Sequence, residues 1–169
     1  MPDPELFKKA KNQALKYLSY KDRSKWEINQ YLEKKKHSHL VIQQTLEYLE
    51  SLDYVDDQRF ALQWGQFNIN KKKLGRNRLY LELLNKGIDR EILENIMSTL
   101  YENNPEIELA KECASKKWES LKDVEADKKK RRLFQHLKRR GFPTEIIYQS
   151  LIKLDMEINT QTSSILDKS

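Results

Sequence analysis

One recurring pattern of leucine and glycine constrains the fold of this chain more than any other feature. Leu83 lies four residues before Gly87, and Leu137 lies four residues before Gly141. Leu32 lies at the same distance before Lys36, which stands where the other two copies have glycine. About fifty residues separate one anchor position from the next, a period typical of helical repeat arrays. We therefore interpret the chain as three copies of one unit.

Apolar side chains flank the three anchors at shared spacings. Upstream, the shared apolar positions are Ile28, Leu79 and Leu133. Five residues downstream of the anchors lie Val41, Ile92 and Ile146. Ten residues downstream lie Leu46, Met97 and Leu151, and thirteen residues downstream lie Leu49, Leu100 and Leu154. These spacings predict one buried helical face in each unit. Trp64 and Trp118 also share a repeat position, which favours the core over stacking on nucleic-acid bases.

Capping residues divide each unit into three predicted helices. Asp3 precedes a helix that Pro4 starts, Ser24 with Glu27 forms a capping box, and Ser38 caps a third helix. The later predicted helix starts are Asp56-Asp57, Asp89 and Pro143-Thr144. Gly87 and Gly141 are predicted to adopt the left-handed conformation just after a helix, where a residue without Cβ meets no steric penalty. Phe60, Ala61, Trp64 and Phe67 form the expected apolar face of the first helix of the second unit.

The sequence thus predicts an all-α protein. Charged residues make up 34% of the chain, and only 4 Gly and 4 Pro are available for turns, which suits solvated helices. The predicted domains are three-helix repeats over residues 1–53, 54–103 and 104–155, followed by a polar, disordered tail over 156–169. Each repeat has too little apolar surface to fold alone, so we expect the repeats to form an elongated, curved, solenoid-like body.

Several classes of protein are not indicated by this sequence. One cysteine, Cys113, and three scattered histidines give neither a disulfide nor zinc-ligand spacing. No nucleophile elbow or phosphate-binding loop appears, and paired acids such as Asp56-Asp57 at a helix start are typical caps. The sequence has no secretory signal and no apolar run long enough to span a membrane. We predict a cytoplasmic protein that is not an enzyme, with no catalytic residue, metal, cofactor, small-molecule substrate or membrane partner.

An excess of basic residues points to an anionic partner. Lys and Arg number 32 against 26 Asp and Glu, giving a net charge of +6. The densest cluster has no acid between its first and last members, which are Lys128, Lys129, Lys130, Arg131, Arg132, Lys138, Arg139 and Arg140. On a helix Lys128, Arg132 and Arg139 lie near one face, so the cluster is expected to project into solvent towards phosphates or an acidic surface. An ordinary solvated helix remains the alternative.

A second basic cluster lies at the predicted joint between the first two helices of the middle repeat. Its members are Lys71, Lys72, Lys73, Arg76 and Arg78. A hydrated linker would have the same composition. Arg76 and Arg78 are the better contact candidates, because a guanidinium binds phosphate or carboxylate with two parallel hydrogen bonds.

Several segments of the chain form a recognisable set: Arg23-Ser24, Glu27-Ile28, Tyr54-Val55-Asp56-Asp57 with Phe60-Ala61, Gly75-Arg76, Glu82-Leu83, Lys86-Gly87-Ile88 and Arg140-Gly141-Phe142. In these segments, and over roughly residues 10 to 154, the chain resembles the RecX family of bacterial regulatory proteins. Lys36 and Trp26 depart from the family pattern, which puts the contacts of the first repeat in doubt.

The resemblance implies a cytoplasmic modulator of the RecA recombinase in DNA repair, homologous recombination and the SOS response. Such a protein binds the groove of the RecA–DNA filament and restrains filament growth, ATP hydrolysis and strand exchange, with weak or indirect contacts to the DNA backbone. The candidate contact residues are Arg76, Arg78, Lys128, Lys130, Arg131, Arg132, Lys138, Arg139 and Arg140. Two alternatives remain: a stand-alone DNA-binding protein with helix-turn-helix-like units, and a helical scaffold without a dedicated partner.

Overall fold

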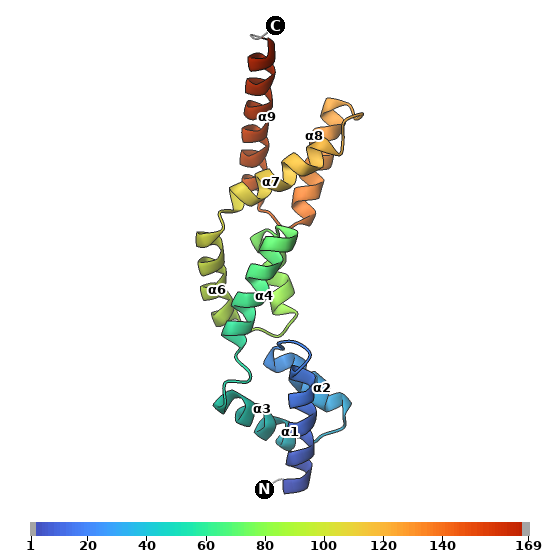
Figure 1. Cartoon of the computed structure of the whole chain (residues 1–169), viewed down its shortest axis with the longest axis vertical. Helices are drawn as coiled ribbons and strands as arrows, with labels where there is room; N and C mark the ends of the chain where they lie inside the picture. The colour runs from blue at the N-terminus through green and yellow to red at the C-terminus, as the bar shows by residue number, and fades with distance from the viewer. Residues whose placement is uncertain (1–2, 167–169) are drawn as a thin grey trace. The chain divides into compact units, whose positions relative to one another are not determined.

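The computed structural model describes the backbone of residues 3–166 and the side chains of residues 3–160. This part of the chain forms nine helices and no strand (Figure 1). The helices are α1 Pro4–Leu18, α2 Lys25–Lys34, α3 His39–Ser51, α4 Asp57–Lys72, α5 Arg76–Leu84, α6 Arg90–Asn103, α7 Glu106–Glu119, α8 Ala126–Arg139 and α9 Thr144–Leu166. The predicted all-α fold of three-helix repeats is confirmed.

The predicted caps begin their helices. The Glu5 N–H donates to the Asp3 carboxylate at 3.0 Å, with Pro4 as the first helical residue. Ser24 and Glu27 form both hydrogen bonds of the capping box, and the Val41 N–H donates to the Ser38 hydroxyl. These bonds satisfy amides that the first turn of a helix leaves without a partner.

The three anchor residues share one backbone conformation. Gly87 and Gly141 have φ values of 74° and 90°, as predicted, and Lys36 has a φ of 64°. A side chain in this region collides with its own backbone, and glycine avoids that collision. The shared conformation confirms that Lys36 occupies the repeat position of the two glycines.

Burial upstream of the anchors agrees with the prediction, but the downstream face is rotated. Ile28, Leu79 and Leu133 are buried. Downstream of the anchors, three positions are buried in all three repeats. Six residues downstream these are Ile42, Leu93 and Ile147, nine residues downstream Thr45, Ile96 and Ser150, and thirteen residues downstream Leu49, Leu100 and Leu154. An apolar search missed the middle set because two of its members carry hydroxyl groups. Thr45 and Ser150 donate these hydroxyls to carbonyls of their own helices, so both are buried without losing a hydrogen bond.

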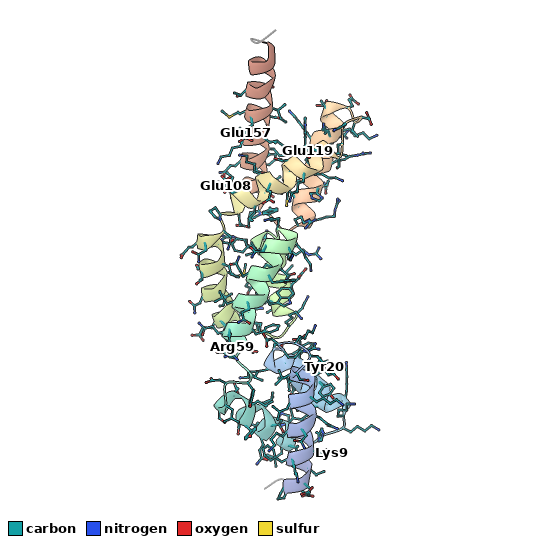
Figure 2. All side chains as sticks on the ribbon, in the orientation of Figure 1. Lys9, Tyr20, Arg59, Glu108, Glu119 and Glu157 are labelled. Carbon is teal, nitrogen blue, oxygen red and sulfur yellow. The ribbon has the colours of Figure 1, made fainter. Side chains whose placement is uncertain are left out.

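Two further expectations differ from the structure. Phe67 is 58% exposed, because Gly65, Asn68 and Ile69 form the buried face of that part of α4. Residues 156–166, expected as a disordered tail, continue helix α9. No glycine or proline follows Pro143 to end this helix. Glu157, labelled on this helix in Figure 2, pairs with Lys111 of α7. Residues 167–169 of that expected tail lie outside the described residues.

Contacts divide the chain into two compact units that each include part of the middle repeat. The first unit comprises Met1–Gly65 and Glu82–Ile96, and the second comprises Gln66–Leu81 and Met97–Ser169. In the first unit, α1, α2 and α3 pack on one another around Ala10, Ala14, Ile28, Leu32 and Leu49. In the second unit, α7 packs along α9, and α8 packs on both of them.

Candidate functional site

One side of α8 carries the longest row of cations in the second unit. Leu133 and Leu137 are buried, which fixes the rotation of the helix. A hollow of about 600 Å³, the α8 hollow, is lined by Lys117, Leu121, Lys128, Arg131, Arg132, Gln135 and Arg139. The α8 residues among these recur every three or four positions, which places them on one helical face. Lys128, Arg132 and Arg139 therefore share one face of α8, as their spacing predicted, and Arg131 joins them; their role as contact residues stays a prediction.

The other α8 cations are held by neighbouring side chains. Lys130 pairs with Asp155 of α9 at 3.2 Å, and the Lys138 ammonium lies 5.8 Å from the centre of the Phe134 ring. Lys129 is only 8% exposed, with its ammonium 3.6 Å from the centre of the Trp118 ring. The expectation that this cluster projects together into solvent is wrong for Lys129, because the Trp118 face compensates its buried charge.

A second hollow brings together two basic clusters that lie far apart in the sequence. It has a volume of about 270 Å³, and we call it the α4–α7 hollow. Its lining residues are Lys71, Lys72, Lys73, Cys113, Lys116, Lys117, Ser120, His136 and Arg140. The Arg140 guanidinium donates to the Lys72 carbonyl, which ties the end of α8 to the end of α4. Lys117 lines both hollows.

Among the residues that the structure describes, neither hollow has an acid in its lining. Among the described side chains, no acidic partner pairs with Lys117, Lys128, Arg131, Arg132 or Arg139. Glu112 partly neutralises the α4–α7 hollow from outside its lining, because Lys73 and Lys116 pair with it at 3.1 and 2.9 Å. The α8 hollow is therefore the less compensated of the two.

Arg76 and Arg78, like Lys130 and Lys138, line neither the α8 hollow nor the α4–α7 hollow. The Arg76 Nε donates to Glu106 at 2.5 Å, and its guanidinium lies 5.5 Å from the centre of the Tyr101 ring. Arg78 donates to the carbonyl of Arg139 at 3.3 Å. Both side chains thus hold parts of the second unit together, although the Arg76 side chain remains 55% exposed.

The positive surroundings affect two titratable groups in the α4–α7 hollow. Burial lowers the pKa of His136, and the charges of Arg140, Lys117 and Arg139 lower it further. Burial raises the pKa of the Cys113 thiol, although nearby cations act in the opposite direction. His136 therefore favours the neutral imidazole, and Cys113 favours the thiol.

Several lining residues were not singled out by sequence reasoning. Lys116, Lys117, Gln135 and His136 line a hollow, yet none belongs to a basic run of three or more. The available signal was the helical spacing of Gln135 and His136 from Arg132 and Arg139. No local pattern pointed to Lys117, because its role comes from the packing of α7 against α8.

Of the paired acids, Asp56 caps its own helix as predicted, whereas Asp57 caps a different helix. The Arg59 N–H donates to Asp56 at 2.9 Å at the start of α4, and the Lys25 N–H donates to Asp57 at 2.8 Å at the start of α2. Within the described residues, no cluster of three or more His, Cys, Asp or Glu side chains is arranged to hold a metal ion. None of the helices described is long and apolar enough to cross a membrane.

Comparison with known proteins gives matches over most of the chain. Models of the first, second and third three-helix domains of RecX match residues 10–49, 56–97 and 104–151. A regulatory protein RecX from Clostridioides difficile is 34% identical over 152 residues, which are 90% of this chain and 71% of that protein. One from Chlorobium phaeobacteroides is 34% identical over 144 residues, covering 85% and 92% of the two chains.

Two further matches add a solved fold and a difference in length. The crystal structure of RecX from Lactobacillus salivarius superposes with a TM-score of 0.81 at 27% identity, covering 90% of this chain and 98% of that one. The regulatory protein RecX of Bacillus licheniformis is 32% identical over 150 residues, and this chain spans 57% of its length.

Proposed function

This chain belongs to the RecX family of regulatory proteins, and we propose that it binds the RecA–DNA filament and restrains its recombinase and ATPase activities. The α8 hollow is the main structural support for this proposal, and we propose it as the contact surface. Its five cations have no acidic partner among the described side chains, and the surface fits a polyanion such as the phosphate backbone of filament DNA. The α4–α7 hollow extends this surface through Lys117.

The cation types in the α8 hollow support contact with phosphates. Arg131, Arg132 and Arg139 offer planar guanidinium groups that bind phosphate oxygens in pairs, and Lys117 and Lys128 add compact charges. No aromatic ring is found among the described lining residues of the hollow, so these residues offer no face on which a base would stack. We therefore expect contacts that do not depend on base sequence, made to DNA within the assembled filament.

A charge-reversal experiment within α8 tests the contact surface. Arg132→Glu with Arg139→Glu changes the α8 hollow, and Lys130→Glu with Lys138→Glu makes the same charge change outside it. We expect the first double variant to lose most of its inhibition of filament ATPase and the second to keep most of it. Circular dichroism and thermal melting check that both stay folded, as exposed substitutions usually allow. Equal loss in both variants would mean that net charge alone matters and would remove the hollow from the proposal.

Stand-alone DNA binding is separated from filament binding by a second measurement. Fluorescence anisotropy with a labelled duplex is followed over a salt series in the absence of recombinase. We expect weak binding with a steep salt dependence, and no preference between unrelated sequences. Tight duplex binding without recombinase would favour the DNA-binding alternative.

A further inference from the structure

The end of one repeat docks on the next in the same way twice. In the first unit, the Ser24 hydroxyl donates to the Lys86 carbonyl at 2.6 Å, and Trp26 packs so closely on Gly87 that a Cβ there would overlap the Trp26 side chain. This first junction joins the N-terminal end of α2 to the C-terminal end of α5.

The second junction lies in the second unit and joins the N-terminal end of α5 to the C-terminal end of α8. The Gly75 N–H donates to the Arg140 carbonyl at 2.8 Å, and the Asn77 N–H donates to the Gly141 carbonyl at 3.0 Å. A Cβ on Gly141 would overlap Arg78. Ser24 and Gly75 occupy one repeat position, and Lys86 and Arg140 occupy another. The two junctions therefore join equivalent positions, although a hydroxyl donates in the first and a backbone N–H in the second.

A junction therefore needs two features. The first concerns the C-terminal end of α5 or α8, which we call the receiving end. It needs an anchor residue without a side chain, as at Gly87 and Gly141. The second concerns the N-terminal end of α2 or α5, which we call the docking end. It needs a second helix that starts eleven residues before its own anchor, as α2 does at Lys25 and α5 does at Arg76. Its first backbone N–H groups then point to the neighbouring repeat, which supplies their acceptors.

The receiving end of the first repeat lacks the first feature. Lys36 has the left-handed backbone of the two glycines, but it carries a side chain and is exposed. In both formed junctions a Cβ at this position would overlap the docking helix. A second helix from another repeat is therefore excluded from this end.

The docking end of the third repeat lacks the second feature. Helix α8 starts at Ala126, one turn earlier than Lys130, the position that matches Lys25 and Arg76. The Lys129 N–H already donates to the Glu125 carbonyl at 2.8 Å inside this extra turn. The Lys129 side chain is packed over Trp118. The extra turn occupies the position from which Ser24 and Gly75 dock.

We propose that these two features prevent the third repeat of one copy from docking on the first repeat of another, so that a second copy of this chain does not add head to tail. On an extended partner of the kind proposed above, neighbouring copies would then bind without using this junction. The inference itself concerns the free protein and does not depend on the proposed function.

Two variants of this chain test the proposal, each changed so that one of the two ends can form a junction. Lys36→Gly opens the receiving end. Lys129→Ser with Lys130→Pro opens the docking end, because serine caps a helix and proline at the first helical position stops the helix from continuing backwards. The control for the first change is Lys35→Gly, since Lys35 is exposed and precedes the anchor with a φ of −80°.

Sedimentation velocity measures whether the single proteins and their mixtures associate. The concentrations extend to about 1 mM, which is the effective concentration that a short linker provides between joined repeats. We expect the unchanged protein and each one-end variant to stay monomeric, and the mixed pair to form a 1:1 complex. Replacing Lys36→Gly by Lys35→Gly in the mixture should abolish the complex.

Three results would overturn the proposal. The first is self-association of the unchanged protein, and the second is the absence of a complex between folded one-end variants. Asp127→Gly with Lys128→Gly and Lys129→Ser is a milder way to unwind the extra turn, and it is measured in parallel. If neither α8 variant melts cooperatively, the extra turn serves folding instead of closure, which also contradicts the proposal.

Discussion

Glu106, the first residue of α7, caps the start of α5 from the following repeat: the Arg76 N–H donates to its carboxylate at 2.7 Å. Asp57, the first residue of α4, accepts from the Lys25 N–H at the start of α2 in the same way. Each carboxylate thus satisfies an amide of a second helix in the preceding repeat. Contacts between neighbouring repeats therefore also cap the starts of helices.

Removing the Glu106 carboxylate is expected to destabilise the second unit. The side chain is almost fully buried and accepts two hydrogen bonds from Arg76. Glu106→Ala should lower the free energy of unfolding by about 2–3 kcal/mol, because hydrogen bonds to a charged group are lost and the Arg76 amide keeps no acceptor. Urea denaturation measures the change. The control is Glu108→Ala, an exposed carboxylate on the same helix whose loss should cost less than about 1 kcal/mol.

Glycine in place of Lys36 is expected to stabilise the protein. A non-glycine residue in the left-handed region costs about 1 kcal/mol, and the exposed Lys36 side chain has no junction to offset this cost. Lys36→Gly should therefore raise the urea midpoint. Gly141→Ala should lower it by more than the same amount, because the new methyl group also overlaps Arg78. Changes of the same sign in both variants would contradict this account of the anchor.

Lys129 is expected to contribute to stability through Trp118. Its ammonium lies 3.6 Å from the centre of the ring, and the residue is buried. Lys129→Gln should lower the free energy of unfolding by about 1–2 kcal/mol, since the attraction between a buried cation and an aromatic ring is lost. The exposed neighbour Lys128 provides the comparison, and Lys128→Gln should change stability by less than about 0.5 kcal/mol. Chemical denaturation of both variants decides the matter.

Stability is expected to decrease in mild acid through His136. Burial and three nearby cations place its pKa in the folded protein below the ordinary value of 6.5. Between the lowered pKa and 6.5 the unfolded chain binds more protons, so the free energy of unfolding falls as the pH falls through this window. Urea midpoints measured from about pH 7.5 to 5 should show this slope. The slope should be smaller in His136→Gln, and an unchanged slope would assign it to other groups.

Lys117 and Lys116 offer a matched pair for the proposed contact surface. Lys117 lines both hollows, whereas Lys116 lines only the α4–α7 hollow and pairs with Glu112 at 2.9 Å. Lys117→Glu should weaken inhibition of the filament ATPase more than Lys116→Glu does, although the two variants have the same net charge. Titration of each variant into preformed filaments gives the two inhibition curves. Coincident curves would show that the position of Lys117 between the hollows has no effect.

Much of the fold could be predicted because its determinants are local. The capping hydroxyls of Ser24 and Ser38, the proline that starts α1, and the glycines at 87 and 141 act within a few residues of their own positions. The repeat added long-range information, since the same apolar position recurs at Ile28, Leu79 and Leu133. The helical face after each anchor was placed incorrectly because Thr45 and Ser150 are polar in composition but are buried with their hydrogen bonds made.

Only part of the candidate site could be predicted, because helical spacing is local whereas contacts between helices depend on tertiary packing. Helical spacing along α8 placed Lys128, Arg132 and Arg139 on one face, and the structure confirms this arrangement. Lys129 lies four residues before Leu133, so the same spacing also indicated the buried face, but its charge within a run of five cations led us to expect exposure. Only the structure showed the Trp118 ring on which it packs. The candidates Arg76 and Arg78 belong to the joints of the second unit, where Glu106 and the Arg139 carbonyl hold them.

The sequence by itself determined the helices, their local caps and the three repeats, since these follow from hydrogen bonds and side-chain spacing within short segments. Only the tertiary structure decided which cations share a hollow, because Lys72 and Arg140 meet across the ends of two helices that are distant in the chain. It also showed why lysine is tolerated at position 36: an anchor needs glycine where another helix packs on it, and in the described residues Lys36 is exposed.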